Sequence, residues 1–221
     1  MIDKKIAIPG DMVSEDPSRS GDGTYVEDGR VYALNYGVLM DSRDKIKIVP
    51  FGGTYFPSYG DVVVGVVSDV SFSNWKVDIC SPYEALLHVS EYPERVNFAE
   101  LDKHIKIGEL IVVRITDVDP TMKIELTLRD RGLGILRGGR VAYISHSKVP
   151  RLIGRSGSMI NMLKKECQCS IIVGKNGRIW VDGEKENMDL AIRAISKIEE
   201  EAHTSGLTDR MSEFLKDENE E

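Results

Sequence analysis

The stretch Lys148–Glu166 reads KVPRLIGRSGSMINMLKKE, and the rest of the chain is arranged around its central tetrapeptide GRSG, Gly154–Gly157. Apolar residues flank the tetrapeptide at helical spacing; Pro150 suits a first helical turn, and Ser158 can start a second helix. Two short helices should therefore meet at a Gly-x-x-Gly turn. The glycines leave the backbone N–H groups and the positive end of the second helix accessible, and Arg155 adds a full charge. A phosphodiester is the expected ligand.

The flanks of this stretch predict a complete domain. A strand is expected at 140–145, a hairpin with an Asn-Gly turn at 170–181, and a long amphipathic helix from about Glu184. This order of elements resembles the KH domain, whose Gly-x-x-Gly loop clamps about four nucleotides of single-stranded RNA. An unrelated α/β corner is the alternative. The residues that the resemblance implies in RNA binding are Gly154, Arg155, Ser156, Gly157, Arg151 and Lys148.

Charge is unevenly distributed along the chain. The formal net charge is −7, yet residues 137–183 carry nine Lys or Arg against two Asp or Glu, which is +7. Residues 57–136 carry −5 and residues 184–221 carry −7. Positive potential is therefore concentrated in the segment that contains GRSG, where a phosphate backbone would lie. The cations expected to be ordinary solvated surface charges are Lys164, Lys165 and Lys175.

Residues 57–131 predict a β unit of about five strands, which fits a Greek-key OB barrel. Its spacing resembles the S-one motif, an RNA-binding OB repeat, at Gly60–Val67, Leu87–Ser90 and Leu128–Asp130. In that family, aromatic, His and basic side chains on one barrel face stack on bases and hold phosphates. Carried over by position, the implied RNA contacts are Phe72, Trp75, His88 and Arg129. A core position for Trp75 and a structural role for His88 are equally open.

The remaining segments complete a multidomain α+β prediction. Residues 1–56 contain short strand-like runs with turn signals, which predict a small all-β unit. Residues 131–139 are glycine-rich and should form the joint before the KH domain, expected at 137–206. Residues 207–221 are expected to be a frayed, acidic tail.

Composition excludes several classes of protein. The sequence has no apolar run long enough to span a membrane, and its N-terminus lacks the apolar core of a signal peptide. Three cysteines, Cys80, Cys167 and Cys169, indicate reduced thiols, so a cytoplasmic location is expected. A zinc site at Cys167 and Cys169 is disfavoured because no second cysteine pair exists. We therefore expect no metal and no cofactor.

The order of units, together with Pro9–Asp11, Gly21–Tyr25, Phe72–Asp78 and Ile153–Ile160, resembles the RNA-binding cap subunit of the archaeal exosome, the ribosomal-RNA-processing protein four family. That resemblance implies a protein that is not itself a nuclease. It implies three copies on a hexameric ring of phosphorolytic exoribonuclease subunits, docked through residues 1–56. It also implies that the cap feeds the 3′ ends of single-stranded RNA into the ring.

Three alternatives can be distinguished. An OB/KH transcription or translation factor of the antitermination type would typically carry two KH units, whereas this chain has one with an intact GRSG. A nuclease would need catalytic carboxylates, and the nearest pair, Asp117 and Asp119, is expected to cap a turn. The other exosome cap subunit should carry a zinc ribbon with paired Cys-x-x-Cys, which this sequence lacks.

Overall fold

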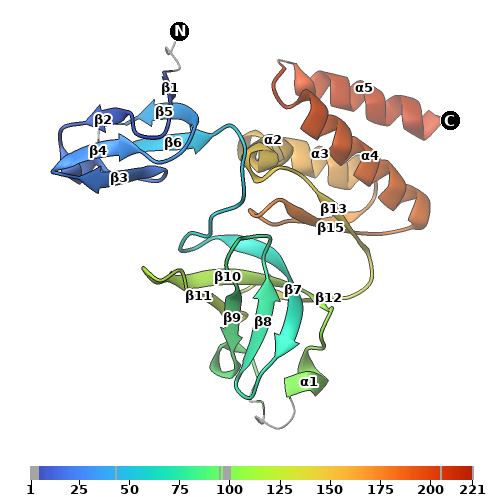
Figure 1. Ribbon diagram of the computed structural model, residues 1–221. Helices are drawn as coiled ribbons and strands as arrows, with labels where there is room; N and C mark the ends of the chain where they lie inside the picture. The colour runs from blue at the N-terminus through green and yellow to red at the C-terminus, as the bar shows by residue number, and fades with distance from the viewer. Residues whose placement is uncertain (1–4, 43, 95, 97–100, 205, 221) are drawn as a thin grey trace. The chain divides into compact units, whose positions relative to one another are not determined.

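The structure is a computed structural model that describes residues 5–42, 44–94, 96, 101–204 and 206–220 (Figure 1). The chain divides into two compact units, Met1–Gly53 and Thr54–Glu221. The first unit is all-β, and the second contains a β-barrel followed by an α/β part. The predicted multidomain α+β fold is confirmed.

The N-terminal unit consists of short strands in two antiparallel three-stranded sheets, ordered β1-β5-β6 and β2-β4-β3. Its elements are β1 (Ile6–Ala7), β2 (Met12–Ser14), η1 (Pro17–Arg19), β3 (Thr24–Glu27), β4 (Arg30–Ala33), β5 (Gly37–Asp41) and β6 (Ile46–Pro50). Side chains from both sheets meet in a small core at Ala7, Ala33 and Ile48. Because this core is small, much apolar surface of the unit stays exposed.

The second unit begins with a closed five-stranded barrel of the predicted OB type. Its strands are β7 (Val62–Val70), β8 (Asn74–Asp78), β9 (Ala85–His88), β10 (Leu110–Val118) and β11 (Ile124–Thr127). They follow the order β11-β9-β8-β7-β10, and pairing of β10 with β11 closes the ring. Strands β9 and β11 pair in parallel. The connection from β9 to β10 contains η2 (Val89–Glu91) and α1 (Leu101–His104).

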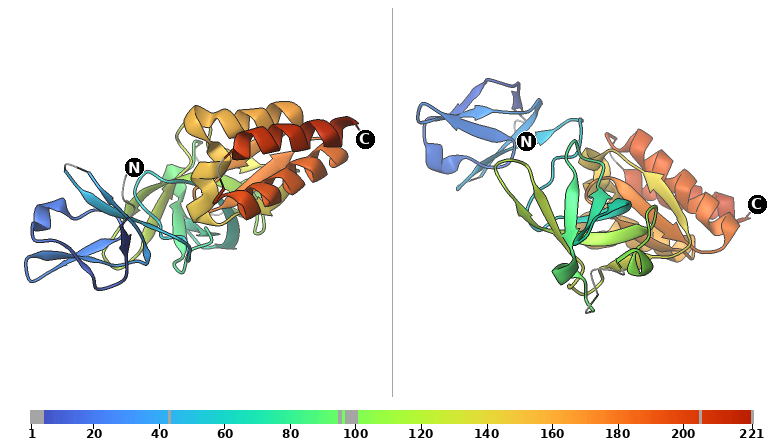
Figure 2. Two further views of the ribbon diagram at one scale, coloured as in Figure 1. Left: turned by 90° about the horizontal axis from the view of Figure 1, so that it is seen from above. Right: turned by 60° about the horizontal axis from the view of Figure 1, so that its bottom comes forward.

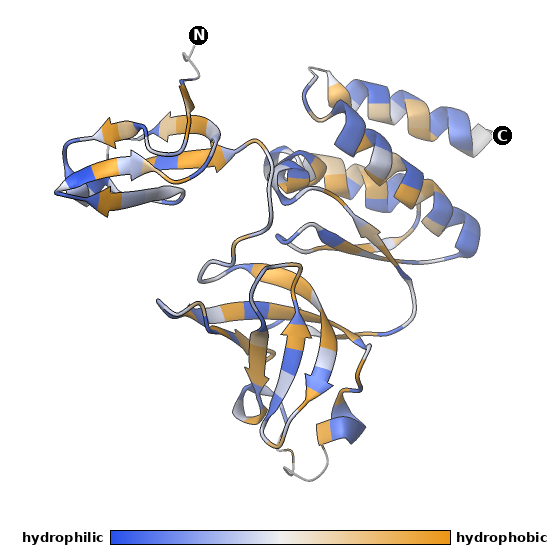
Figure 3. Ribbon diagram, in the orientation of Figure 1, coloured by the Kyte–Doolittle hydropathy of each residue, from blue (hydrophilic) through white to orange (hydrophobic). Residues whose placement is uncertain are grey.

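Alternating side chains define the inside and outside of the barrel. Figure 3 shows hydrophobic and hydrophilic residues alternating along β8, where Trp75 and Val77 are buried. Trp75 is 0% exposed. Its indole Nε1–H donates to the Leu101 carbonyl at 3.3 Å and to the Ile105 carbonyl at 3.2 Å. Because the ring fills the core and its polar atom is satisfied, the prediction that Trp75 contacts RNA is wrong.

The predicted glycine-rich joint, residues 131–139, is in part a strand. Strand β12 (Gly134–Leu136) pairs antiparallel with the first residues of β10 and extends the barrel sheet. The turn out of the barrel comes at Gly138 and Gly139, both with φ of 70°. A Cβ at Gly139 would lie 2.6 Å from the Val181 carbonyl oxygen, so the tight passage requires glycine there.

The α/β part has the order strand, helix, GRSG, helix, hairpin, helix, followed by one further helix. Its elements are β13 (Arg140–Tyr143), η4 (His146–Lys148), α2 (Val149–Ile153), η5 (Arg155–Gly157), α3 (Ser158–Glu166), β14 (Ser170–Val173), β15 (Arg178–Asp182), α4 (Lys185–Glu201) and α5 (Leu207–Glu220). The sheet order is β13-β15-β14, all antiparallel. The helices cover one face of this sheet (Figures 1 and 2), and the core between them is continuous.

Helix α5 replaces the predicted frayed tail. Leu207, Met211 and Leu215 are buried and recur every four residues, so they place one helix face in the core shared with α3 and α4. The Lys197 ammonium lies over the Phe214 ring at 4.2 Å from its centroid. The expectation of a frayed tail is therefore wrong over Leu207–Glu220, because its acidic residues concealed an apolar stripe.

The tip of the β14–β15 hairpin packs against the barrel. Asn176 is 5% exposed, and its amide Nδ2 donates to the Val64 carbonyl at 2.8 Å and the Ile79 carbonyl at 2.9 Å. Its Oδ1 accepts from the Val64 N–H at 3.4 Å. Gly177 closes the turn at φ of 86°, and a Cβ there would lie 2.0 Å from the Ile144 carbonyl oxygen. One side chain therefore joins the two parts through backbone groups on β7 and after β8.

Two ion pairs flank this buried amide. Arg178 is 4% exposed and donates to the Asp78 carboxylate at 2.8 Å and to the Asp78 carbonyl at 2.9 Å. Burial opposes ionisation of Asp78, but hydrogen bonds from Arg178 and from the Cys80 N–H outweigh it and hold the pKa of Asp78 below its ordinary value. Lys175 pairs with Asp61, a buried carboxylate that also accepts from the Tyr55 hydroxyl at 2.6 Å.

Candidate RNA-binding surfaces

The GRSG loop forms a sharp turn between α2 and α3. Gly154, Ser156 and Gly157 have φ of 74°, 49° and 78°. A Cβ at Gly154 would lie 2.7 Å from the Met159 backbone nitrogen, so this glycine allows the loop to press against the start of α3. No side chain caps the N-terminus of α3 at Gly157. The first amides of α3 and the positive end of its dipole therefore face an exposed loop, which is an arrangement suited to anions.

Seven of the nine cations of residues 137–183 fall into two groups. Four take part in ion pairs with carboxylates: Arg140 with Asp189, Lys165 with Glu166, Lys175 with Asp61, and Arg178 with Asp78. Lys148, Arg151 and Arg155 surround the GRSG turn, and none of them has an ion-pair partner within the described residues. The positive charge available to a ligand is therefore smaller than the sequence total, but it is centred on the predicted loop.

A groove adjoins GRSG on the side of α5. It is lined by Arg151 of α2 and Arg155 of the loop. Its other polar residues include Thr204, Thr208 and Asp209, before and at the start of α5. The Thr204 hydroxyl donates to the Glu201 carbonyl at 2.8 Å, and Arg210 bridges to the Glu201 carboxylate at 2.6 Å. These contacts tie the end of α4 to the first turn of α5. The RNA contacts predicted for Gly154, Arg155, Ser156, Gly157, Arg151 and Lys148 stay predictions.

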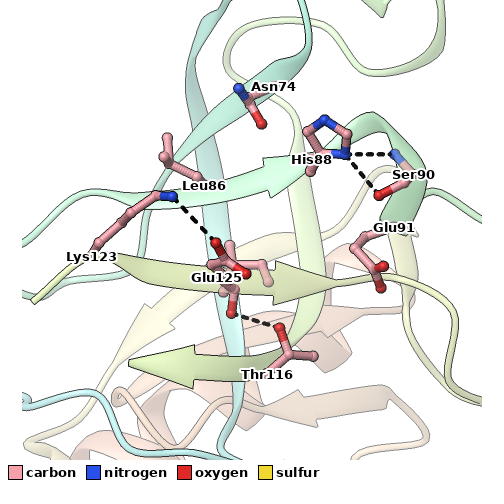
Figure 4. Close-up of a pocket in the computed structure, with 9 residues that line it drawn as sticks. Asn74, Leu86, His88, Ser90, Glu91, Thr116, Lys123 and Glu125 are labelled. Carbon is pink, nitrogen blue, oxygen red and sulfur yellow. Dashed lines mark hydrogen bonds and ion pairs between the residues drawn. The ribbon is translucent and has the colours of Figure 1, made fainter. Parts of the chain in front are cut away.

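A second hollow lies on the outside of the barrel, across β8, β9, β11 and β10 (Figure 4). Asn74 and His88 are directly opposite each other on β8 and β9, and Leu86 is opposite Glu125 on β9 and β11. Outward positions on neighbouring strands thus line one pocket, whose volume is about 470 Å³. The residues that line it are Asn74, Leu86, His88, Ser90, Glu91, Thr116, Lys123, Glu125 and Leu126.

His88 is held in one orientation at the edge of this pocket. Its Nδ1 accepts the Ser90 backbone N–H at 3.1 Å and lies 2.7 Å from the Ser90 hydroxyl oxygen (Figure 4). Since Nδ1 accepts a backbone N–H, the proton of the neutral ring sits on Nε2. His88 therefore presents a hydrogen-bond donor away from η2.

The other predicted barrel residues lie near the ends of these strands. Phe72 is 79% exposed in the β7–β8 turn, next to the Ser73–Asn74 segment whose backbone meets Val89. Arg129 is exposed just after Leu128, whose N–H donates to the Glu91 carbonyl at 3.0 Å. The structure thus brings Phe72, His88 and Arg129 to the region of the pocket, and their RNA contacts stay predictions.

Sequence reasoning missed the pocket carboxylates and their neighbours. Glu91, Thr116 and Glu125 belong to no motif, yet Thr116 and Glu125 are joined by a hydrogen bond from the Thr116 hydroxyl to the Glu125 carbonyl at 3.1 Å. The alternation of side chains between the two faces of a strand could have identified these residues. Once His88 is assigned to the outer face, alternation assigns outward positions on the neighbouring strands to the same face.

The cysteines do not form a further site in this structure. Cys167 and Cys169 are buried in the α/β core, and burial raises the pKa of the Cys167 thiol to about 12. In the part of the chain that is described, no group of three or more His, Cys, Asp or Glu side chains is placed to hold a metal ion. Likewise, no helix there is long and apolar enough to cross a membrane.

An OB barrel joined to a GxxG domain by a buried hairpin tip places the chain among multidomain proteins of the S1–KH class. Three family models match it: an Rrp4 exosome RNA-binding protein N-terminal domain at residues 4–52, an Rrp4 S1 domain at 54–97 and a KH domain at 139–187. The chain belongs to the Rrp4 family of exosome components.

Full-length relatives carry the same assignment. Exosome complex component Rrp4 of Methanosarcina mazei is 52% identical over 98% of this chain and 84% of its own length. The Picrophilus torridus component of that name is 43% identical over 96% of this chain and 92% of its own length. A crystal structure assigned to an exosome complex RNA-binding protein has a TM-score of 0.69 and 38% identity, covering 76% of this chain and 98% of the other.

Proposed function

We propose that this chain is a non-catalytic, RNA-binding cap component of a cytoplasmic exosome, which captures single-stranded RNA and passes its 3′ ends to a hexameric ring of exoribonuclease subunits. The names of its relatives support the exosome. The observation that carries RNA binding is the GRSG loop, where an uncapped helix start lies beside Arg151 and Arg155, both without ion-pair partners among the described residues. An antitermination factor is not favoured by these relatives.

Phosphate recognition suits a protein that feeds RNA of many sequences. Contacts to the RNA backbone fix position without reading bases. Because Asn176 joins the KH part to the barrel, the loop and the barrel pocket belong to one body, so RNA held at one is at high effective concentration for the other. We propose three copies on one ring, which would raise the effective concentration of bound RNA further.

The N-terminal unit offers a docking face for the ring. On the outer side of the β1-β5-β6 sheet, Ile6, Val38 and Val49 lie in register across the three strands, and Met40 lies beside them on β5. Ile6, Met40 and Val49 are 55%, 58% and 43% exposed. Apolar side chains that stay in water do not stabilise the isolated chain, whereas a permanent protein partner would bury them.

Substitution in this face tests the docking. We expect Val49→Asp to prevent assembly on the purified ring, measured by native mass spectrometry, while RNA affinity is retained. Val26→Asp is the matched control, since Val26 is similarly exposed, at 47%, but lies on the other sheet. Assembly of the Val49→Asp chain with wild-type stoichiometry would refute this docking face, and the mass of the wild-type complex counts its copies.

Asp119, one of the two carboxylates considered for a nuclease site, has structural partners. Asp119 accepts hydrogen bonds from the Thr121 hydroxyl at 2.7 Å and the Lys123 N–H at 2.8 Å, and these lower the pKa of Asp119. It therefore closes the β10–β11 turn, as the sequence predicts. The test is incubation of the isolated chain with RNA, with phosphate and with divalent cations. An RNA-degrading activity that copurifies with the chain would overturn the non-catalytic proposal. In a separate test, copurification of the chain with RNA polymerase would favour the antitermination alternative.

A further inference from the structure

The barrel pocket differs in charge from the GRSG loop. Its one cation, Lys123, lies 3.3 Å from a carboxylate oxygen of Glu125 and is neutralised by it (Figure 4). The Glu91 carboxylate lines the same pocket, and no residue in the described part of the chain pairs with it. The pocket thus carries a net negative charge, which disfavours a phosphate at that position.

The hydrogen-bonding groups of the pocket are complementary to a different part of RNA. Ionised Glu91 and Glu125 accept hydrogen bonds only, and the Thr116 hydroxyl donates a hydrogen bond to the Glu125 carbonyl and keeps acceptor capacity. The donors are the His88 Nε2–H, the Asn74 amide and the Lys123 ammonium, which already contacts Glu125. A ligand that fits must therefore bring a donor to the carboxylates and an acceptor to the His88 side.

The edges of the nucleobases meet this requirement to different degrees. Adenine and cytosine pair an exocyclic amine with an adjacent ring acceptor, and guanine presents an amine beside a ring N–H. Uracil presents one N–H between two carbonyl oxygens, so binding at the carboxylates would place a carbonyl against a negative charge. Carboxylates that accept from base amines are an established way of reading bases.

We propose that the barrel pocket binds one nucleobase by its amine-bearing edge, through Glu91 and Glu125, and so discriminates against uracil. Phe72 is 79% exposed in the β7–β8 turn, two residues before the pocket residue Asn74, where a neighbouring base would pass. The inference rests on the proposed RNA-binding function and adds a division of labour. GRSG holds the phosphates without regard to sequence, and the barrel supplies a preference for base type.

The test compares labelled oligo(A), oligo(C) and oligo(U) of one length by fluorescence anisotropy, with the full chain at fixed salt. The wild type should bind oligo(A) and oligo(C) about tenfold more tightly than oligo(U), the order expected for one good carboxylate–amine pair. The combined Glu91→Gln, Glu125→Gln variant should bring the ratio close to one, because an amide can donate to a uracil carbonyl. Glu84→Gln is the control, since Glu84 is exposed and pairs with Lys76 away from the pocket.

Three results would overturn the base-reading inference. One is equal affinity of the wild type for oligo(A) and oligo(U). A second is an unchanged ratio in the double Gln variant. A third is a gain in affinity that is the same for all three RNAs, because this would show that the carboxylates only repel phosphate. In each of these cases RNA still binds and the proposed function stands, whereas failure of the wild type to bind any of the RNAs would refute the proposed function itself.

Discussion

Asn176→Ala should separate the barrel from the KH part. The substitution removes the amide that donates to the Val64 and Ile79 carbonyls at 2.8 and 2.9 Å. The Ile79 carbonyl loses a buried partner, whereas the Val64 carbonyl keeps a longer contact with Arg178 at 3.3 Å. A buried carbonyl left unsatisfied costs about 1–3 kcal/mol and a lost hydrogen bond about 1 kcal/mol, so we expect about 2–4 kcal/mol in the free energy of unfolding.

The assay is urea unfolding followed by tryptophan fluorescence. The two tryptophans report on the two parts separately, since Trp75 lies inside the barrel and Trp180 on β15 of the KH part. A single transition in the wild type should move to lower urea and divide into two in Asn176→Ala. Asn176→Asp should be at least as damaging, because it directs a charge at two carbonyls.

Asn161 provides the matched control. It is exposed on α3, and Asn161→Ala should change stability by no more than about 0.5 kcal/mol. A loss of less than about 0.5 kcal/mol in Asn176→Ala, with one unbroken transition, would refute the view that this amide joins the two parts.

Two further stability predictions follow from the same contacts. Leu215→Ala should cost about 2–4 kcal/mol in urea unfolding because Leu215 is fully buried, while exposed Lys216→Ala should be nearly neutral; equal effects would mean that α5 is not part of the core. The folded state lowers the pKa of Asp78, so its ion pair with Arg178 adds stability above the ordinary carboxyl pKa of 3.8 and loses it as pH falls below that value. The wild type should therefore lose more stability than Asp78→Asn between neutral pH and pH about 3, and identical losses would contradict this role.

Local sequence patterns predicted the elements of the KH part and the barrel well. The GRSG turn, with φ of 74° and 78° at its glycines, follows from a Gly-x-x-Gly between two short apolar helical runs. The barrel strands follow from period-two alternation in β8 and from valine- and isoleucine-rich runs in β7 and β10. In both cases a residue's role is set by neighbours close in sequence, which is the information a single sequence contains.

Roles that depend on distant packing were not predictable in the same way. Trp75 and Phe72 are both aromatic residues near one turn, but only the closed barrel shows that one ring is enclosed and the other exposed. Lys175 and Arg178 count as positive charge in the sequence, yet their carboxylate partners are 114 and 100 residues away. Acidic residues along α5 concealed the spacing of its three buried side chains.

Substitution within the GRSG loop tests whether this loop binds the RNA phosphates. Gly154 is unsuitable as a target, since a Cβ there would crowd the α3 backbone. Arg155 and Ser156 are exposed, and the left-handed φ of 49° at Ser156 is one that Asp tolerates. Arg155→Asp with Ser156→Asp therefore changes the charge of the loop while keeping its backbone. Lys164→Asp with Lys165→Ala makes the same total change in charge at the far end of α3 and serves as the control.

The measurement is the affinity for single-stranded RNA across a salt series. We expect the loop variant to lose at least about tenfold in affinity, while the control stays close to wild type. The slope of log affinity against log salt concentration should become shallower by about one unit or more, as expected for the loss of at least one phosphate contact. Equal losses in the two variants, or an unchanged salt dependence in the loop variant, would contradict the assignment of GRSG as the phosphate-binding site.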